Sequence, residues 1–200
     1  MLIAPPPIHA FISNRKSIRA FDPQPMNDET VYQLFEAARW APSAFNEQPW
    51  RFIIARRETE AEFQKMLEVL SPSNRNWAMN GSVLILTIAK LNSSHNNLPN
   101  RHALHDVGLS VGNLSVQATS MGLSLHQMGG FDSVKAKEFY EIPEGYEPIS
   151  IIIVGFPGNI ELLPEALRLR ELKERVRMPV EDIVFSGTFG KGESILNKTF

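Results

Sequence analysis

Two uncharged, apolar runs constrain this chain more than any other feature of its sequence. They are VLILTIA at residues 83–89 and ISIIIVGF at residues 149–156. Both runs are far too short to span a bilayer, and both have the length and composition of buried strands. We therefore expect core strands over 83–89 and 149–154, and no membrane segment.

Helices are expected around these strands. The first begins after Asn27, whose side chain suits an N-cap, and ends before Pro42. Other helices are expected over 60–70, 101–121 and 132–140, and further strands over 51–55 and 123–127. Helices and strands alternate too irregularly for a doubly wound parallel sheet. We expect a single α+β domain over residues 1–200, with a central sheet flanked by helices.

The helix expected over 101–121 is the longest. Its apolar residues step by three and four along one side: Leu104, Val107, Val111, Leu114, Ala118 and Met121. Gly122 is placed to end it. Gly108 and Gly112 weaken an isolated helix, which suggests that another backbone packs closely against this one. The helix is therefore expected at the centre of the structure or of a dimer.

Composition excludes several classes of protein. The formal net charge is −2 and the calculated pI about 6.2, which argues against a surface built for nucleic acid or anionic membranes. There is no cysteine, so disulfides, thiolate metal sites and cysteine nucleophiles are ruled out. The first residues lack the charged-then-apolar order of a signal peptide, and we expect a cytoplasmic protein.

The stretch SNRKSIRAFDPQP, residues 13–25, gathers cationic and hydroxyl side chains. Arg15, Lys16, Ser17 and Arg19 lie within five positions. Guanidinium groups bind phosphate through paired hydrogen bonds, and a serine hydroxyl adds a neutral donor. The stretch could hold a phosphate, but a solvated basic turn explains the same residues, so both alternatives are open at this point.

The loop PSAFNEQPW, residues 42–50, is rich in amides. Ser43, Asn46 and Gln48 supply donors and acceptors suited to the edge of a heteroaromatic ring, and Phe45 and Trp50 could form apolar walls. An ordinary turn whose amides bond to their own backbone is the alternative.

Two further features have a functional and a structural explanation. Gly129 and Gly130 could aim backbone N–H groups at a ligand or could form a plain turn. His102 and His105 lie one helical turn apart, but no third ligand can be identified from spacing, and we expect no metal site.

The chain has no G-x-G-x-x-G after a strand and no P-loop, so Rossmann dehydrogenases and P-loop NTPases lose their main support.

Five motifs, in this order and spacing, resemble the nitroreductase family of FMN-dependent oxidoreductases. They are RKSIRAF, AARWAPSAFNEQPWRFI, HQMGGFD, IIIVGFPG and RVRMP. The resemblance covers nearly the whole chain. It implies an α+β fold around an antiparallel-rich sheet and a homodimer with its sites at the interface. It also implies that C-terminal arms, here about residues 160–200, are exchanged between subunits.

The resemblance also implies cofactor-binding roles for single residues. The FMN phosphate, ribityl chain and part of the ring would be bound by Arg15, Lys16, Ser17 and Arg19, with Arg175 and Arg177 as further cations at the phosphate. The loop that meets the flavin from the partner subunit would contain Ser43, Ala44 and Asn46, supported by Gln48. The pyrimidine edge would be bound by Asn74, and flavin N5 and O4 would be approached by the backbone of Met128, Gly129 and Gly130.

Two residues depart from the family pattern. Trp77 stands where several members have a lysine near flavin N1 and O2, and Gly129 replaces an acidic residue common in the enteric-type enzymes.

The implied reaction is reduction of a nitroaromatic, quinone or related acceptor by NAD(P)H, in a ping-pong scheme with one shared pocket. No side chain then needs to act as acid or nucleophile, because the flavin performs the electron transfer. Dehalogenases and flavin-modifying enzymes share this fold. A non-catalytic flavin-binding redox sensor and a purely structural protein are alternatives from other classes.

Overall fold

A five-stranded antiparallel sheet forms the centre of the molecule. The structure, a computed structural model, describes residues 8–192 of the 200-residue chain. The strands are β1 (Phe21–Asp22), β2 (Trp50–Arg56), β3 (Val83–Lys90), β4 (Ser124–Met128) and β5 (Tyr146–Pro157). Each pair is antiparallel: β2 with β3, β3 with β5, and β5 with both β4 and β1. The predicted α+β class with an antiparallel-rich sheet is confirmed.

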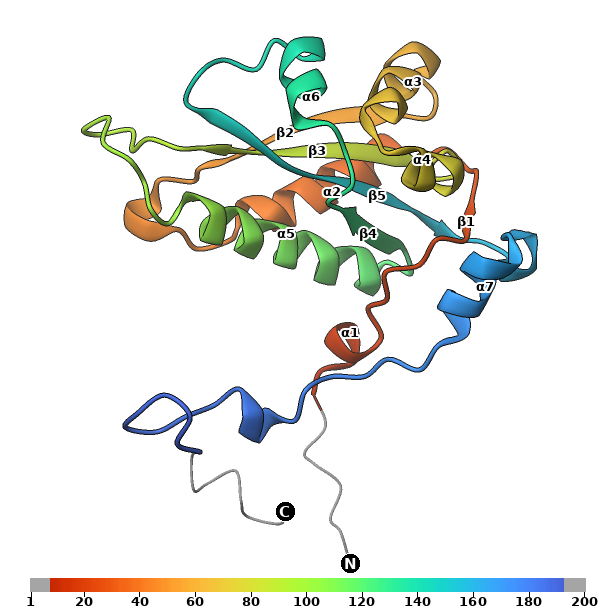
Figure 1. The fold of residues 1–200 in the computed structure, drawn as a ribbon. Helices are drawn as coiled ribbons and strands as arrows, with labels where there is room; N and C mark the ends of the chain where they lie inside the picture. Colours follow the sequence, from red (N-terminus) through yellow and green to blue (C-terminus); the bar gives the residue numbers. More distant parts are fainter. Residues whose placement is uncertain (1–7, 193–200) are drawn as a thin grey trace, which may run out of the picture.

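Helices cover both faces of this sheet (Figure 1). One face is covered by α2 (Asp28–Arg39) and α5 (Ala103–Ser120), and the other by α3 (Glu60–Val69), α4 (Pro72–Ala78) and α6 (Ser133–Phe139). The one-turn helix α1 (Ala10–Ser13) and α7 (Glu165–Leu172) lie outside these layers.

Burial on both faces explains the two apolar runs. On β3, Val83 and Ile85 pack toward α2 and α5, whereas Leu84 and Leu86 pack toward the other helices. A strand covered on both sides has no solvent-facing position, so its sequence does not alternate with polar residues. Each such side chain contributes about 1.5–3 kcal/mol by leaving water.

Local signals set the ends of α2 and α5. The Asn27 side chain accepts a hydrogen bond from the Thr30 N–H at 2.8 Å, and so caps α2 as expected. At the end of α5, Gly122 adopts φ +72°, a left-handed conformation in which glycine has no Cβ to strain.

Helix α5 is buried on one face only. Leu104, included in the predicted apolar stripe, is 55% exposed, so its expected burial is wrong for the single chain. A Cβ at Gly108 or Gly112 would meet no atom within 4 Å. The close neighbour predicted from these glycines is therefore not found within residues 8–192.

The predictions differ from the structure in two further elements. No helical pattern marks the polar stretch around Asn74, yet it forms α4, with Pro72 at its first turn and Trp77 and Ala78 buried. Proline suits the first turn of a helix, and burial of the indole fixes the segment against the sheet. Strand β5 extends beyond 149–154 at both ends, because it pairs with β3, β4 and β1 in turn.

The C-terminal segment leaves the layered body after α7. It passes the stretch that follows α1, where Arg175 binds the Arg15 carbonyl, and then continues below the layered body (Figure 1). Residues 173–184 are exposed throughout. Of the predicted arm of about 160–200, residues 173–192 project from the body, whereas Leu167 of α7 packs against the core. Residues 193–200 lie outside the described part.

Membrane insertion has no candidate helix in the described part of the chain: none between residues 8 and 192 is both long and apolar enough to cross a bilayer.

Candidate functional site

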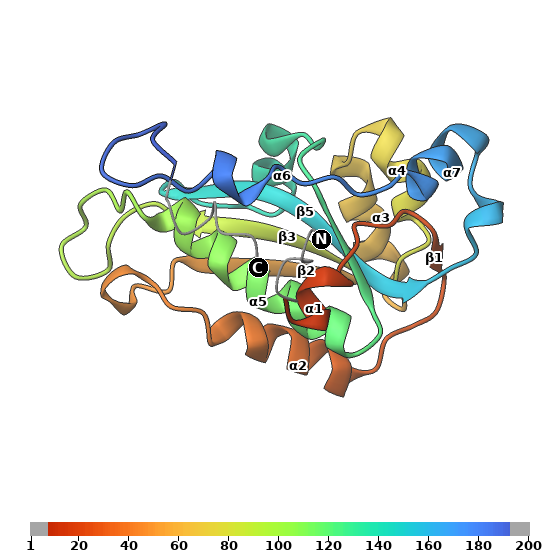
Figure 2. The ribbon, with the colours of Figure 1, turned by 90° about the horizontal axis from the view of Figure 1, so that it is seen from below.

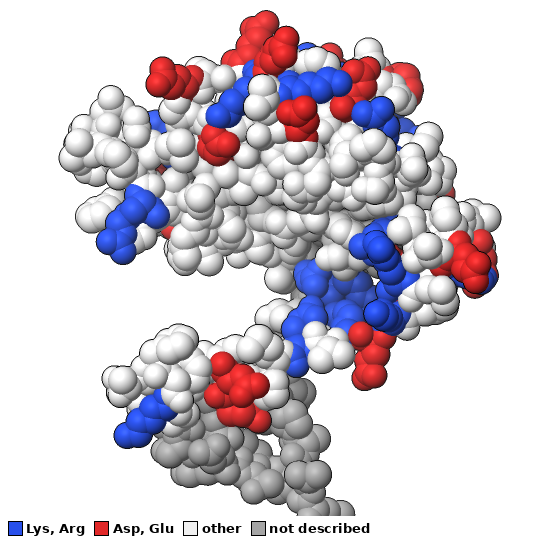
Figure 3. Space-filling model, in the orientation of Figure 1, with Lys and Arg blue, Asp and Glu red and all other residues white. Residues whose placement is uncertain are grey.

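Cations from both ends of the chain gather in a recess between the body and the C-terminal segment. Figure 3 shows the Lys and Arg side chains concentrated there. One pocket of about 400 Å³ is lined by Arg15, Arg175 and Arg177, and an adjoining pocket of about 510 Å³ by Lys16, Arg19 and Arg175 among others. We call these five residues and Ser17 the cationic recess. It unites the two basic motifs that the sequence separates.

The recess depends on side chains that bind backbone across long sequence distances. Arg175 donates from Nη1 to the Arg15 carbonyl at 2.7 Å and from Nη2 to the Ser13 carbonyl at 2.6 Å. Arg15 in turn donates to the Ser17 hydroxyl oxygen at 3.1 Å. The C-terminal segment therefore holds residues 13–17 in place.

Three arginines of the recess have no carboxylate partner in the described part of the chain. Within residues 8–192, Arg15, Arg175 and Arg177 form no ion pair. Burial lowers the pKa of Arg15, and the nearby charges of Arg177 and Arg175 lower it further. Cations that repel one another in this way favour a bound anion.

Arg19 has a different environment. Its Nη1 lies 3.2 Å from Glu171 Oε1, and the Glu171 side chain is only 7% exposed. The guanidinium also lies over the ring of Trp77, 5.8 Å from its centroid. Trp77 itself is 3% exposed and packs on Phe21. The indole is therefore part of the core beneath Arg19 and offers no cation in place of the family's lysine.

The segment Met128–Gly130 lies against α4. Asn74 donates from Nδ2 to the Gly130 carbonyl at 3.1 Å. A Cβ on Gly130 would lie 2.8 Å from that same nitrogen, so any other residue here would require the Asn74 side chain to move. At Gly129 the corresponding space is open, and neither glycine has a positive φ. Met128 is buried, which leaves only its backbone to serve a ligand.

Residues 43–48, which we call the amide loop, are held in a strained conformation. Phe45, Asn46 and Gln48 have φ of +54°, +55° and +47°. Left-handed residues other than glycine are uncommon and cluster at functional sites. Within the loop, the Gln48 N–H donates to the Ser43 hydroxyl at 3.0 Å and the Gln48 side chain to the Asn46 carbonyl at 3.3 Å.

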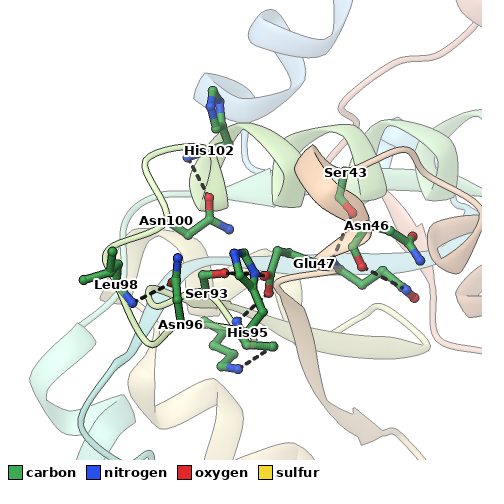
Figure 4. A network of polar contacts seen from close by, with 12 residues as sticks. Ser43, Asn46, Glu47, Ser93, His95, Asn96, Leu98, Asn100 and His102 are labelled. Carbon is green, nitrogen blue, oxygen red and sulfur yellow. Dashed lines mark hydrogen bonds and ion pairs between the residues drawn. The ribbon is translucent and has the colours of Figure 1, made fainter.

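Two carboxylates anchor the amide loop. Asp106 on α5 accepts the Ala44 N–H at 3.0 Å. Glu47 accepts hydrogen bonds from the Ser93 hydroxyl and the Ser94 N–H and contacts His95 Nδ1 at 2.7 Å (Figure 4). These bonds, the Ser93 hydroxyl first, lower the pKa of Glu47 to about 2. Neither carboxylate was identified from the sequence as an anchor of this loop. For Glu47 a signal was available, because it is the one acidic residue in the loop.

The cationic recess and the amide loop are far apart in one chain. The loop lies at the start of α5, beside Asp106, whereas residues 13–19 lie toward the other end of this helix (Figures 1 and 2). Eighteen helical residues span about 27 Å. The predicted site residues therefore form two separate groups, and the exposed face of α5 runs between them.

The chemistry of a serine hydrolase does not fit this structure. In the Ser93, His95 and Glu47 cluster, the hydroxyl and the carboxylate both contact Nδ1 of the same imidazole, so the ring cannot relay a proton between them. The run GLSVG at 108–112 matches G-x-S-x-G in letters only. Its Ser110 lies within α5, buried, and donates to the Ala38 carbonyl at 3.0 Å.

Metal ligation has no candidate cluster among residues 8–192, where no three His, Cys, Asp or Glu side chains converge. His105 Nδ1 lies 3.0 Å from Asp106, and His102 caps the start of α5 without using its side chain.

Comparisons with known proteins place these features in a family. The model of the nitroreductase family matches residues 12–156. A 15.4 kDa uncharacterised protein of Mycolicibacterium smegmatis is 31% identical over 147 residues, which cover 70% of this chain and 97% of that protein. An FMN reductase [NAD(P)H] of Bacillus subtilis is 24% identical over 74% of this chain and 65% of its own length. A crystal structure described as an oxidoreductase containing FMN superposes with a TM-score of 0.89 at 34% identity, covering 94% of this chain and 96% of that one.

Proposed function

The chain belongs to the nitroreductase family, and from this premise we propose that it is an FMN-dependent oxidoreductase. It would use NAD(P)H to reduce nitroaromatics, quinones or related small acceptors by a ping-pong mechanism. Support comes from the similar oxidoreductase containing FMN and from the more distant FMN reductase [NAD(P)H]. Because NAD(P)H is supplied inside cells, we place the reaction in the cytoplasm.

The cationic recess is the observation that carries this proposal. Arg15, Arg175 and Arg177 converge without a carboxylate partner among the described residues, and their mutual repulsion would be relieved by a phosphate. Ser17 adds a neutral donor, while Lys16 and Arg19 line the adjoining pocket. These residues fit the phosphate and ribityl chain of FMN.

Bound FMN would supply the electron transfer from NAD(P)H to the acceptor. The protein's own residues would then bind and orient. The backbone of Met128, Gly129 and Gly130 would approach the ring, with Gly129 leaving room for it and Asn74 holding the segment in place. Arg19, fixed by Glu171 and Trp77, would place a positive charge beside the ring. No side chain is required as a catalytic acid.

A homodimer would complete each site. The amide loop, with Ser43, Ala44, Asn46 and Gln48, is too far along α5 to reach the recess of its own chain. We propose that it meets the FMN of the partner subunit. The exposed Leu104, Gly108 and Gly112 on α5 would form the contact between subunits, and the arms of about 160–200 would be exchanged.

The first experiment measures FMN binding. Purified protein mixed with FMN should retain flavin absorbance after gel filtration. Replacing Arg15 by alanine should weaken FMN binding about tenfold to hundredfold, because a charge-assisted hydrogen bond is lost. Arg39→Ala is the matched control, since Arg39 is exposed on α2 and pairs with Glu36. Equal FMN affinity of wild type and Arg15→Ala would refute the assignment.

The second experiment separates an enzyme from a redox sensor. An enzyme should oxidise NADH or NADPH over many turnovers with menadione or a nitrofuran, and Arg15→Ala saturated with FMN should retain much of that turnover. A sensor would be reduced once and then stop. Absence of turnover with both nicotinamides and all quinone, nitro and enone acceptors would contradict the proposed activity.

A further inference from the structure

His126 is a half-buried histidine next to Arg15 and Arg19 of the cationic recess. It lies on β4, and its Nδ1 is 2.8 Å from the Ile18 carbonyl oxygen. A carbonyl oxygen can only accept, so Nδ1 carries the proton. The imidazole also packs on Trp77, with ring centroids 4.7 Å apart.

The segment that His126 binds has no regular structure of its own. Residues 14–20 form neither helix nor strand, so groups from elsewhere in the chain position their backbone. The Gly158 N–H binds the Ala20 carbonyl at 2.8 Å, and side chains bind the carbonyls before it. Arg175 binds the carbonyls of Ser13 and Arg15 at one end. His126 binds the carbonyl of Ile18 at the other end, immediately before Arg19.

The surroundings of His126 keep its ring neutral. Burial lowers its pKa, and the charges of Arg19 and Arg15 lower it further, although hydrogen bonds to the Ile18 and Ser17 carbonyls act in the opposite direction. From α4 the ring faces uncharged Trp77, and its neighbour in register on β5 is Ile153. Glu171 of α7 is paired with Arg19. The imidazole thus donates a hydrogen bond without adding another cation.

We propose that His126 is a positioning residue for the FMN site: by donating Nδ1–H to the Ile18 carbonyl, above the Trp77 ring, it holds Arg19 and Ser17 where the cofactor requires them. The inference rests on the proposed function. In this proposal His126 raises the affinity for FMN without touching it, and the residues of the recess make the contacts with the cofactor.

Three substitutions separate the hydrogen bond from the packing of the ring. In His126→Asn the amide nitrogen can take the place of Nδ1, whereas in His126→Gln the amide reaches the place of Nε2. His126→Leu keeps apolar bulk and removes the donor. We expect the Leu and Gln variants to bind FMN about tenfold more weakly, which is the effect of losing one hydrogen bond, and the Asn variant to bind nearly as the wild type does.

The dissociation constant is measured by quenching of FMN fluorescence, and the melting temperature of each FMN-free variant checks its fold. His102→Leu is the matched control, because the exposed His102 side chain makes no capping bond.

If wild type itself binds no FMN, the proposed function is wrong. If wild type binds FMN and the Leu variant binds it equally well, the positioning role is wrong. A loss in the Asn variant as large as in the Leu variant would assign the effect to ring packing and also overturn the inference.

Discussion

At the scale of single residues, the amide loop shows how buried carboxylates maintain a conformation that its own side chains disfavour. Phe45, Asn46 and Gln48 each adopt a left-handed conformation, at a cost of order 1–3 kcal/mol per residue. Two carboxylates offset this cost: Asp106 accepts the Ala44 N–H of the loop, and Glu47 accepts hydrogen bonds from one neighbouring segment, residues 93–94. The strain is concentrated where the exposed Phe45 would meet a partner or substrate.

Replacing Glu47 by glutamine should make stability less dependent on pH in acid. The folded pKa of Glu47 is about 2, below the value of about 4.3 for a free glutamate. Its stabilising contribution is therefore complete above pH 4.3 and is lost as pH falls toward 2. Urea unfolding at several pH values between 7 and 3 should show the variant less stable at pH 7, with the difference narrowing below pH 4.3. A difference that stays constant with pH would contradict this prediction.

His126 should destabilise the FMN-free protein in mild acid. Its folded pKa is lowered from 6.5, so below pH 6.5 the unfolded chain binds a proton that the folded chain resists. The melting temperature of wild type should fall more between pH 7.5 and 5.5 than that of His126→Asn, which cannot titrate. Parallel pH profiles for the two proteins would show that His126 is not responsible.

At the scale of elements, α5 presents a face that has no partner within the described chain. Gly108 and Gly112 lie on it beside the exposed Leu104, Leu109 and Val116. A solvent-exposed glycine inside a helix lowers the stability of that helix by about 1 kcal/mol relative to alanine, so both glycines destabilise α5. Close packing of a second α5 against this face would explain why glycine stands at both positions.

Gly112→Ala tests this explanation by the sign of its effect. On a solvent-exposed helix the change should stabilise by about 0.5–1 kcal/mol. At a close contact between subunits, the added methyl group should instead weaken the dimer. We expect a lower melting temperature and a higher monomer fraction in sedimentation velocity at low concentration. A more stable variant with unchanged sedimentation would place α5 in solvent.

Most elements of the fold could be predicted from local pattern. The buried strands followed from runs such as that at 83–89, and α2 from its cap at Asn27 and its apolar spacing. Helix α4 could not be predicted, because Asn74 and its polar neighbours carry no helical pattern and the segment is stabilised by tertiary burial of Trp77.

The members of the candidate site were easier to predict than their arrangement. Arg175 binds the carbonyl of a residue 160 positions away, and His126 one 108 positions away. Contacts at such separations follow from the path of the whole chain, on which local spacing gives no information. For the same reason, local spacing could not place Arg15 and Asn46 apart in one chain. Only the resemblance, which assigns the loop of Asn46 to the flavin of the partner subunit, implied this separation.

At the scale of the whole molecule, the C-terminal segment exposes more apolar surface than a lone subunit would be expected to keep. Its exposed side chains include Val176, Met178, Val180, Ile183 and Phe189, the last of which is 93% exposed. Together with the open face of α5, they form extensive apolar surface that is typical of protein–protein contacts. Both observations favour the proposed exchange of arms in a homodimer.

The separation of the cationic recess from the amide loop has a genetic consequence. If each site takes the recess from one subunit and the loop from the other, Arg15→Ala and Asn46→Ala damage different halves. In a mixed dimer, both defects then fall in one site and the second site is intact. At an FMN concentration too low to load the damaged sites, each variant alone should be nearly inactive. Random pairing of the two should then restore about a quarter of wild-type NAD(P)H oxidation, since half of the dimers are mixed and each has one good site. Two defective alleles would thus complement each other. Both changes placed on one allele would not be complemented by a second copy of that allele. If the co-expressed variants recover no activity, each subunit works alone.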